Sequence, residues 1–200
     1  MPVVQITLIE GYDADTKARL LEALTASVRT TIGAPLDGIT VMVNEVGAAD
    51  YRRGGRQRTP GVPPPPAAGL VRGFLAAMER RDLDAARAFL GPDFAMVFPG
   101  DVRLRRLEDL VAFGQSRYRS VRKTFAGFDE VPGLDETVVY CHGTLAGEWP
   151  DGTPFDGIRF IDRFAIRDGL IAGQWVWNDM GEARAGGTTT LGGRIGGTLA

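Results

Sequence analysis

Alternating and helical patterns follow one another in the first part of the chain. Apolar residues occupy every second position from 4 to 8, which is the period of a strand. Asp13 is a suitable N-cap and Gly33 a suitable C-cap for a helix, and between them apolar residues recur at helical spacing over 21–32. A second alternating run covers 39–43. The order strand, helix, strand predicts a βαβ unit with parallel strands and a right-handed crossover.

The second half of the chain begins with helical spacing and ends in alternation. Apolar residues at helical spacing predict helices near 70–78, 83–90 and 106–121. Alternating runs separated by turn signals predict strands at residues 123–131, 138–149, 158–167 and 170–178. Helices followed by an antiparallel meander predict an α+β domain.

A proline-rich stretch separates the two patterns. Pro63–Pro66 fix φ and remove amide donors, which excludes helix and central strand and is typical of a linker. After Glu182 the chain is rich in Gly and Thr, which favours a flexible tail or a segment that pairs with a partner subunit. The predicted divisions are a first unit at 1–55, a linker at 56–67, a second unit at 68–182 and a flexible tail at 183–200.

The first unit is short for an independent domain. A βαβ unit of residues 1–55 buries too little surface to be stable alone. We therefore expect it to associate with copies of itself as a homo-oligomer.

Composition and charge exclude several classes of protein. Apolar residues make up 44% and charged residues 24% of the 200 residues, as in ordinary globular proteins. The net charge of −2 argues against a nucleic-acid partner. No apolar run reaches the roughly 18–20 residues that span a bilayer, and no leader is evident, so we expect a cytoplasmic protein without a membrane partner. A single cysteine, Cys141, and a single histidine, His142, exclude Cys/His zinc sites, so we expect no metal unless carboxylates alone hold one.

The first unit resembles the 4-oxalocrotonate tautomerase family over residues 2–55. The resemblance rests on the opening MPVVQITLIEG, on the amphipathic helix, and on the later GAPLDGITVMVNEV. In that family the initiator Met is removed and the exposed nitrogen of the following proline is the catalytic base. The resemblance therefore implies that Pro2 is a catalytic base and that no cofactor is needed.

A terminal proline nitrogen suits this chemistry. A free α-amino group has an ordinary pKa of ~7.7–8.0, which an apolar pocket or nearby cations lower. Such a base can move a proton from carbon next to a carbonyl, and a secondary amine can also attack a carbonyl. The alternative is that Pro2 is only the second residue of a strand, but the matching βαβ pattern favours the catalytic role.

Differences from the family pattern restrict the class of substrate that the first unit could accept. In the parent enzyme two arginines bind the dicarboxylate substrate, and these positions align with Tyr12 and Thr40 here. The aromatic residue of that site aligns with another aromatic residue, Tyr51. Without the arginines the bidentate carboxylate contacts are lost, and the basic residues within 52–58 are better explained as a solvated segment than as a replacement. The implied substrate is a neutral or phenolic enol in a site shaped by Tyr12, Thr40 and Tyr51. Alternatively, the unit serves only assembly.

The second unit resembles the SnoaL-like branch of the nuclear transport factor 2-like superfamily over residues 68–182. The resemblance is carried by Asp162-Arg163-Phe164, Asp168-Gly169-Leu170-Ile171 and Trp177-Asn178-Asp179. It implies a curved sheet wrapped around a helix, with a cone-shaped apolar pocket. Members include polyketide cyclases, ketosteroid-type isomerases, dehydratases and proteins that only bind, so the fold alone does not decide the activity.

Two aspartates are candidate bases in this unit. Asp162 lies in an otherwise apolar row, where it would either act as an acid or base of raised pKa or form a salt bridge to a nearby arginine such as Arg159 or Arg163. Asp179 matches approximately the late-strand aspartate proposed as the base in SnoaL-like cyclases, or it is a surface residue that ends the strand.

Aromatic residues and one imidazole complete the candidates. Trp175 and Trp177 share a face with Asp179 and would wall a substrate site. His142 has an ordinary pKa of ~6.5 that suits proton transfer, although a lone strand histidine is more often a hydrogen-bonded core or surface residue. Tyr118 would donate to an enolate oxygen or cap a helix.

Both resemblances imply cofactor-independent proton transfer next to a carbonyl. We therefore predict a tautomerase or isomerase for an enolisable carbonyl compound, with Pro2 as base and a coupled cyclase or isomerase step in the second pocket. One alternative places the chemistry in the second unit, with Asp179 or Asp162 as base and the first unit as a degenerate oligomerising module. Another alternative is a non-catalytic assembly that binds small molecules.

Overall fold

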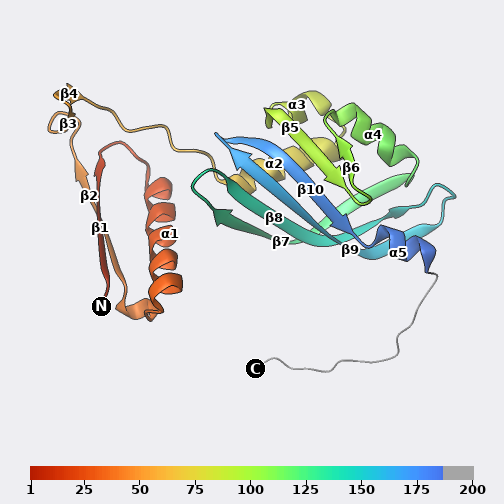
Figure 1. Ribbon diagram of the computed structural model, residues 1–200, viewed down its shortest axis with the longest axis horizontal. Helices are drawn as coiled ribbons and strands as arrows, with labels where there is room; N and C mark the ends of the chain where they lie inside the picture. The colour runs from red at the N-terminus through yellow and green to blue at the C-terminus, as the bar shows by residue number, and fades with distance from the viewer. Residues whose placement is uncertain (187–200) are drawn as a thin grey trace. The chain divides into compact units, whose positions relative to one another are not determined.

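The computed structural model describes residues 1–186 and divides into two compact units, of which the first is Met1–Pro63 (Figure 1). The first unit contains the predicted βαβ arrangement. Its elements are β1 (Val3–Ile9), α1 (Ala14–Ile32), the 3-10 turn η1 (Leu36–Gly38), β2 (Thr40–Val46), β3 (Arg52–Arg53) and β4 (Arg56–Gln57). Strands β1 and β2 are parallel, with Val3 opposite Thr40 and Ile9 opposite Val46.

Both predicted caps of α1 are confirmed. The Asp13 side chain accepts a hydrogen bond from the backbone N–H of Thr16 at 2.7 Å, which satisfies one of the free donors at the helix start. Gly33 ends the helix in the left-handed region at φ 74°, a conformation that glycine adopts without steric cost.

The first unit leaves its apolar surface open. None of residues 1–66 is buried, and α1 has no buried residue at all. Large apolar side chains remain exposed at Val3, Ile32, Leu36 and Met42. Larger patches of exposed apolar surface are typical of interaction surfaces.

The second unit is an α+β domain built on one six-stranded sheet. Its elements are α2 (Ala67–Glu79), α3 (Leu83–Arg87), β5 (Leu90–Phe98), β6 (Val102–Leu104), α4 (Leu107–Gln115), β7 (Ser120–Pro132), β8 (Thr137–Glu148), β9 (Pro154–Arg167), β10 (Leu170–Asn178) and α5 (Met180–Ala185). The strand order is β6-β5-β10-β9-β8-β7, and only the β5–β10 pair is parallel. The predicted antiparallel meander is thus present in β7 to β10.

Helix α2 lies on the inner face of this curved sheet, against β7 and β8 (Figure 1). Phe74 of α2 is buried and meets Phe94 of β5 and Phe164 of β9 edge to face, with ring centroids 6.2 and 6.1 Å apart. Such pairs add to the stabilisation that burial of the rings provides. The helix therefore shares one core with strands β5 and β9.

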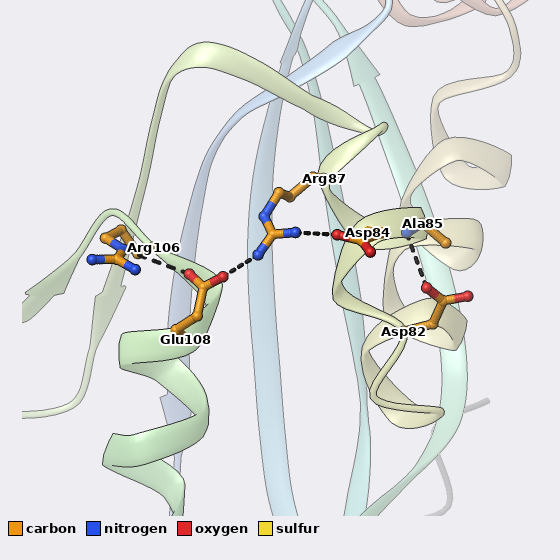
Figure 2. A network of polar contacts seen from close by, with 6 residues as sticks. All are labelled: Asp82, Asp84, Ala85, Arg87, Arg106 and Glu108. Carbon is orange, nitrogen blue, oxygen red and sulfur yellow. Dashed lines mark hydrogen bonds and ion pairs between the residues drawn. The ribbon is translucent and has the colours of Figure 1, made fainter.

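Polar contacts join α3 to α4 at one end of the sheet (Figure 2). Arg87 of α3 forms ion pairs with Asp84 and with Glu108, and Arg106 lies 3.6 Å from the same glutamate. Hydrogen bonding to its own backbone N–H and to Arg87 lowers the pKa of the Glu108 carboxyl. The network links α3 to α4, and α4 supplies part of the wall described below.

Two predicted helices end earlier in the structure, and two strands of the sheet were not predicted. The helix expected at 83–90 ends at Arg87, because the chain enters β5 at Leu90 and pairs in parallel with β10. The helix expected at 106–121 ends at Gln115, because β7 begins at Ser120. Strands β5 and β6 were not predicted. Alternation of inward Phe94, Met96 and Phe98 in β5 was the signal for the first of them.

The ends of the predicted linker and tail carry structure. Residues 56–57, expected in the linker, form β4 and pair with β3. Helix α5 continues to Ala185, three residues into the predicted tail, while the remainder at 187–200 lies outside the described residues. No helix among residues 1–186 is long and apolar enough to cross a membrane.

Two candidate active sites

Pro2 lies directly before β1, beside the first residue of β2. Its carbonyl oxygen accepts a hydrogen bond from the backbone N–H of Thr40 at 3.1 Å. The structure therefore brings these two predicted site residues together at one end of the parallel pair.

Tyr12 and Tyr51 follow the opposite end of the same strands. Tyr12 comes after Ile9, the last residue of β1, and Tyr51 comes after Val46, the last residue of β2. Seven residues of strand span roughly 20 Å. Within one copy of the chain, these tyrosines are therefore a strand length away from Pro2.

The chain after β4 returns to Tyr12. The tyrosine hydroxyl accepts a hydrogen bond from the backbone N–H of Gly61 at 3.1 Å. Pro60 packs so closely on Gly11 that a Cβ there would lie 2.9 Å from the proline ring, and Gly11 has φ 132°. Glycine at position 11 thus permits this close return.

The second unit contains a cavity of about 300 Å³ on the inner side of the sheet. Its walls are mostly apolar and come from α2, α4, β5 and β7. Exposed charged side chains of Arg72, Glu79 and Arg81 also line it. The apolar and aromatic wall residues are Phe74, Leu75, Ala76, Met78, Phe98, Leu110, Tyr118, Val121 and Phe125.

Two polar side chains, Lys123 and Gln174, also line this cavity, and both reach Asp162. The Lys123 ammonium forms an ion pair with Asp162 Oδ2, and Gln174 Nε2 donates to the same oxygen at 3.2 Å. Asp162 is fully buried and Gln174 is 4% exposed. We call these three residues the polar floor.

The polar floor contains two oxygens without a donor. Asp162 Oδ1 and Gln174 Oε1 are buried and have no hydrogen-bond partner among the described residues. A buried acceptor without a donor costs about 1–3 kcal/mol, so such atoms are rare in folded proteins.

The predicted apolar row around Asp162 is confirmed. The predicted salt bridge from Asp162 to a nearby arginine is wrong, because its partner is Lys123. Arg159 and Arg163 point to the other face of the sheet, since neighbouring strand residues alternate. There Arg163 pairs with Glu136 at 2.8 Å and Arg159 with Asp179 at 2.6 Å. Lys123 was missed because it lies 39 residues away along the chain.

Asp179 and both tryptophans lie outside the cavity. Trp175 and Trp177 stand opposite Arg163 and Ile161 in the β9–β10 pair, on the outer face of the sheet. Trp177 is 50% exposed, and the Asp179 side chain is engaged by Arg159. The three residues share a face, as expected, but that face does not wall the pocket.

The remaining candidates divide between the two faces. His142 is exposed on the outer face, where its Nδ1 lies 3.8 Å from Asp129 Oδ2. Tyr118 lines the cavity, with its hydroxyl packed against Gly114. Cys141 is buried opposite Asp162, and burial, with the nearby carboxylate, raises the pKa of its thiol to about 12. The thiol is thus held in its protonated form.

Comparison with known proteins defines the class of this protein: it is an enzyme of the isomerase class with a tautomerase unit and a SnoaL-like unit. More closely, the chain belongs to two families. Residues 2–57 match the family described as tautomerase enzyme, and residues 71–174 match the SnoaL-like domain.

Similar proteins cover the two units separately. A probable tautomerase of Ralstonia nicotianae is 38% identical over 65 residues, which are 32% of this chain and 93% of that protein. A probable tautomerase of Bacillus cereus is 37% identical over 57 residues, 28% of this chain and 93% of that protein. The crystal structure of TerC with polyporic acid superimposes with a TM-score of 0.50 at 18% identity, covering 59% of this chain and 95% of TerC, which shows the fold of the second unit alone.

Proposed function

We propose that this enzyme is a cofactor-independent tautomerase that acts on an enolisable carbonyl compound with the nitrogen of Pro2 as general base. The observation that carries the proposal is the position of Pro2. The tautomerase match begins at this residue, and β1 and β2 hold it next to Thr40 at 3.1 Å. Removal of Met1 would turn its amide nitrogen into a free secondary amine.

The proposed reaction needs only proton transfer. The neutral amine takes the proton from the hydroxyl of an enol, and the resulting ammonium delivers a proton to the carbon as the carbonyl forms. Because only the neutral amine is a base, turnover should fall as pH decreases through the pKa of this nitrogen.

The substrate side of the proposal rests on the residues around the site. Tyr12 and Thr40 carry no positive charge, so neither can form the bidentate, charged contact that a guanidinium makes with a carboxylate. A neutral or phenolic enol therefore fits better than a dicarboxylate.

We further propose that the complete site forms between copies of the chain. Pro2 and Thr40 lie at one end of the β1–β2 pair, and Tyr12 and Tyr51 follow the other end. A second copy can bring its tyrosines to the first copy's proline. The exposed apolar residues of the unit provide the surface for such a homo-oligomer.

The second unit would carry out a coupled cyclase or isomerase step on the same class of compound. Its cavity is apolar, with a polar floor suited to an oxygen of the ligand. The buried Asp162 favours one competing function, in which this aspartate is the base and the first unit only assembles the enzyme.

Ketonisation of the ethyl ester of an aryl enolpyruvate, which is a neutral enol, tests the role of Pro2 and is followed by ultraviolet absorbance. Pro2→Ala should lower turnover by roughly 10²–10⁴-fold, the usual contribution of a general base. Pro35→Ala, a matched change in the same unit, should keep wild-type turnover, and intact mass would verify that Met1 is absent. Equal turnover in Pro2→Ala and wild type would reject the proposal and leave the second unit as the catalytic one.

A further inference from the structure

We propose that the cavity of the second unit binds a planar apolar ligand through a hydroxyl group, an enol or a phenol, held between Gln174 and Lys123. The proposal deepens the proposed function, on which it rests, because it names the tautomer that the second unit accepts. It is carried by the unpaired amide oxygen of Gln174, a residue that lines the cavity, and by the Lys123 cation that lines it too.

The orientation of the Gln174 amide is fixed by chemistry. Asp162 is held in an ion pair, so its oxygens accept hydrogen bonds, and the amide must turn its Nε2 group toward Oδ2. The amide oxygen of Gln174 is thereby left without a donor, and Gln174 lines the cavity. A ligand that contacts this amide oxygen would therefore have to supply a hydrogen-bond donor.

The Lys123 ammonium can donate hydrogen bonds to a ligand in the same part of the cavity. An ammonium has several N–H donors, and the ion pair with Asp162 uses only part of them. The ammonium also lies 4.4 Å from the centre of the Phe160 ring, and its side chain lines the cavity beside Gln174. Donors therefore remain for an oxygen of the ligand.

A hydroxyl group meets both demands with a single oxygen. It donates its proton to Gln174 Oε1 and accepts from Lys123 Nζ. A ketone or an ether oxygen only accepts, so it would leave the buried glutamine oxygen unpaired at a cost. The floor thus selects the enol of a compound over its keto tautomer.

The walls of the cavity determine the size and the apolar character of the rest of the ligand. Phe74, Phe98 and Phe125 with Leu110 and Val121 offer flat apolar surface. A volume of about 300 Å³ is at the small end of ligand pockets. A ligand of one or two rings fits these walls, with the exposed charges of the mouth left in water.

Titration calorimetry on the full-length wild-type chain tests the selection with two probes, 2-naphthol and 2-methoxynaphthalene. They share the rings and the oxygen, but only the naphthol can donate. The naphthol should bind roughly 10-fold or more tightly than the ether. Equal binding, tighter binding of the ether, or binding of neither probe would overturn the proposal, and equal binding would indicate that water alone pairs with Gln174.

A pair of variants locates the site of discrimination. Gln174→Met removes the acceptor while keeping a side chain of similar length, and the two probes should then bind equally. Gln115→Met makes the same change at the exposed end of α4 and should keep the wild-type preference. A preference that survives in Gln174→Met would place the discrimination elsewhere and overturn the proposal. Because neither probe is turned over, this result is independent of the Pro2 test.

Discussion

At the scale of single residues, the ion pair of Lys123 and Asp162 holds a fully buried charge. Asp162 is fully buried, whereas the Lys123 side chain is 26% exposed at the cavity. A buried charge is tolerated only with its partner, because the interior cannot replace its hydration. Loss of either partner alone therefore destabilises the second unit, and Lys123 also lines the cavity.

Removing one partner should be costly, and removing both should cost less. Lys123→Met leaves an unpaired buried carboxylate and should lower the free energy of unfolding by about 3 kcal/mol. Adding Asp162→Asn removes that charge and should restore part of the loss. Urea unfolding followed by tryptophan fluorescence reports on this unit alone, because all three tryptophans lie in it. A double variant less stable than Lys123→Met would contradict this account.

At the scale of elements, Glu136 joins the turn between β7 and β8 to the outer face of β9. Its carboxylate pairs with Arg163 at 2.8 Å and with Arg167 at 2.9 Å. Hydrogen bonds from Arg163, and to a smaller extent from Arg167, lower the pKa of the Glu136 carboxyl below its ordinary value of 4.5. A group whose pKa is lowered on folding stabilises the protein above its ordinary pKa and loses that contribution as pH falls.

Glu136→Gln should therefore destabilise the second unit at pH 7 by about 1 kcal/mol. The difference from wild type should shrink as pH drops below 4.5, since protonation then removes the same charge. Urea midpoints measured across pH would show this, with the exposed neighbouring change Asp135→Asn as control. A gap between Glu136→Gln and wild type that stays constant at low pH would be inconsistent with the ion pairs.

Periodicity predicted the elements better than it predicted their partners. The caps at Asp13 and Gly33 depend on local chemistry and were predictable, as were the strands of the meander. The alternation of β5 was a local signal that was overlooked, whereas its parallel pairing with β10 could not be predicted because it joins distant segments. Lys123 was likewise missed, since its role follows from a contact across β7, β8 and β9. Alternation placed Trp175 on one face of its strand but could not say which face lines the cavity.

At the scale of the whole molecule, the account requires association through the first unit. Met42 of β2 is a large apolar side chain that is 42% exposed, on the face of the β1–β2 pair that an oligomer would cover. Met42→Glu would bury a carboxylate in that contact and should yield smaller particles in sedimentation velocity, with loss of turnover. Leu134→Glu makes the same kind of change at an exposed turn of the second unit and should leave both unchanged. A wild-type chain that sediments as a monomer would contradict a shared site.

The central claim is that the free nitrogen of Pro2 performs the chemistry, and blocking that nitrogen alone tests it most directly. Insertion of one Ala between Met1 and Pro2 keeps the proline ring and the strand but places its nitrogen in a peptide bond. Ketonisation of the aryl enolpyruvate ester by this variant, compared with wild type of verified mass, is the measurement. We predict a loss of roughly 10²–10⁴-fold with unchanged oligomeric size. Turnover equal to wild type would show that the nitrogen of Pro2 is not the base.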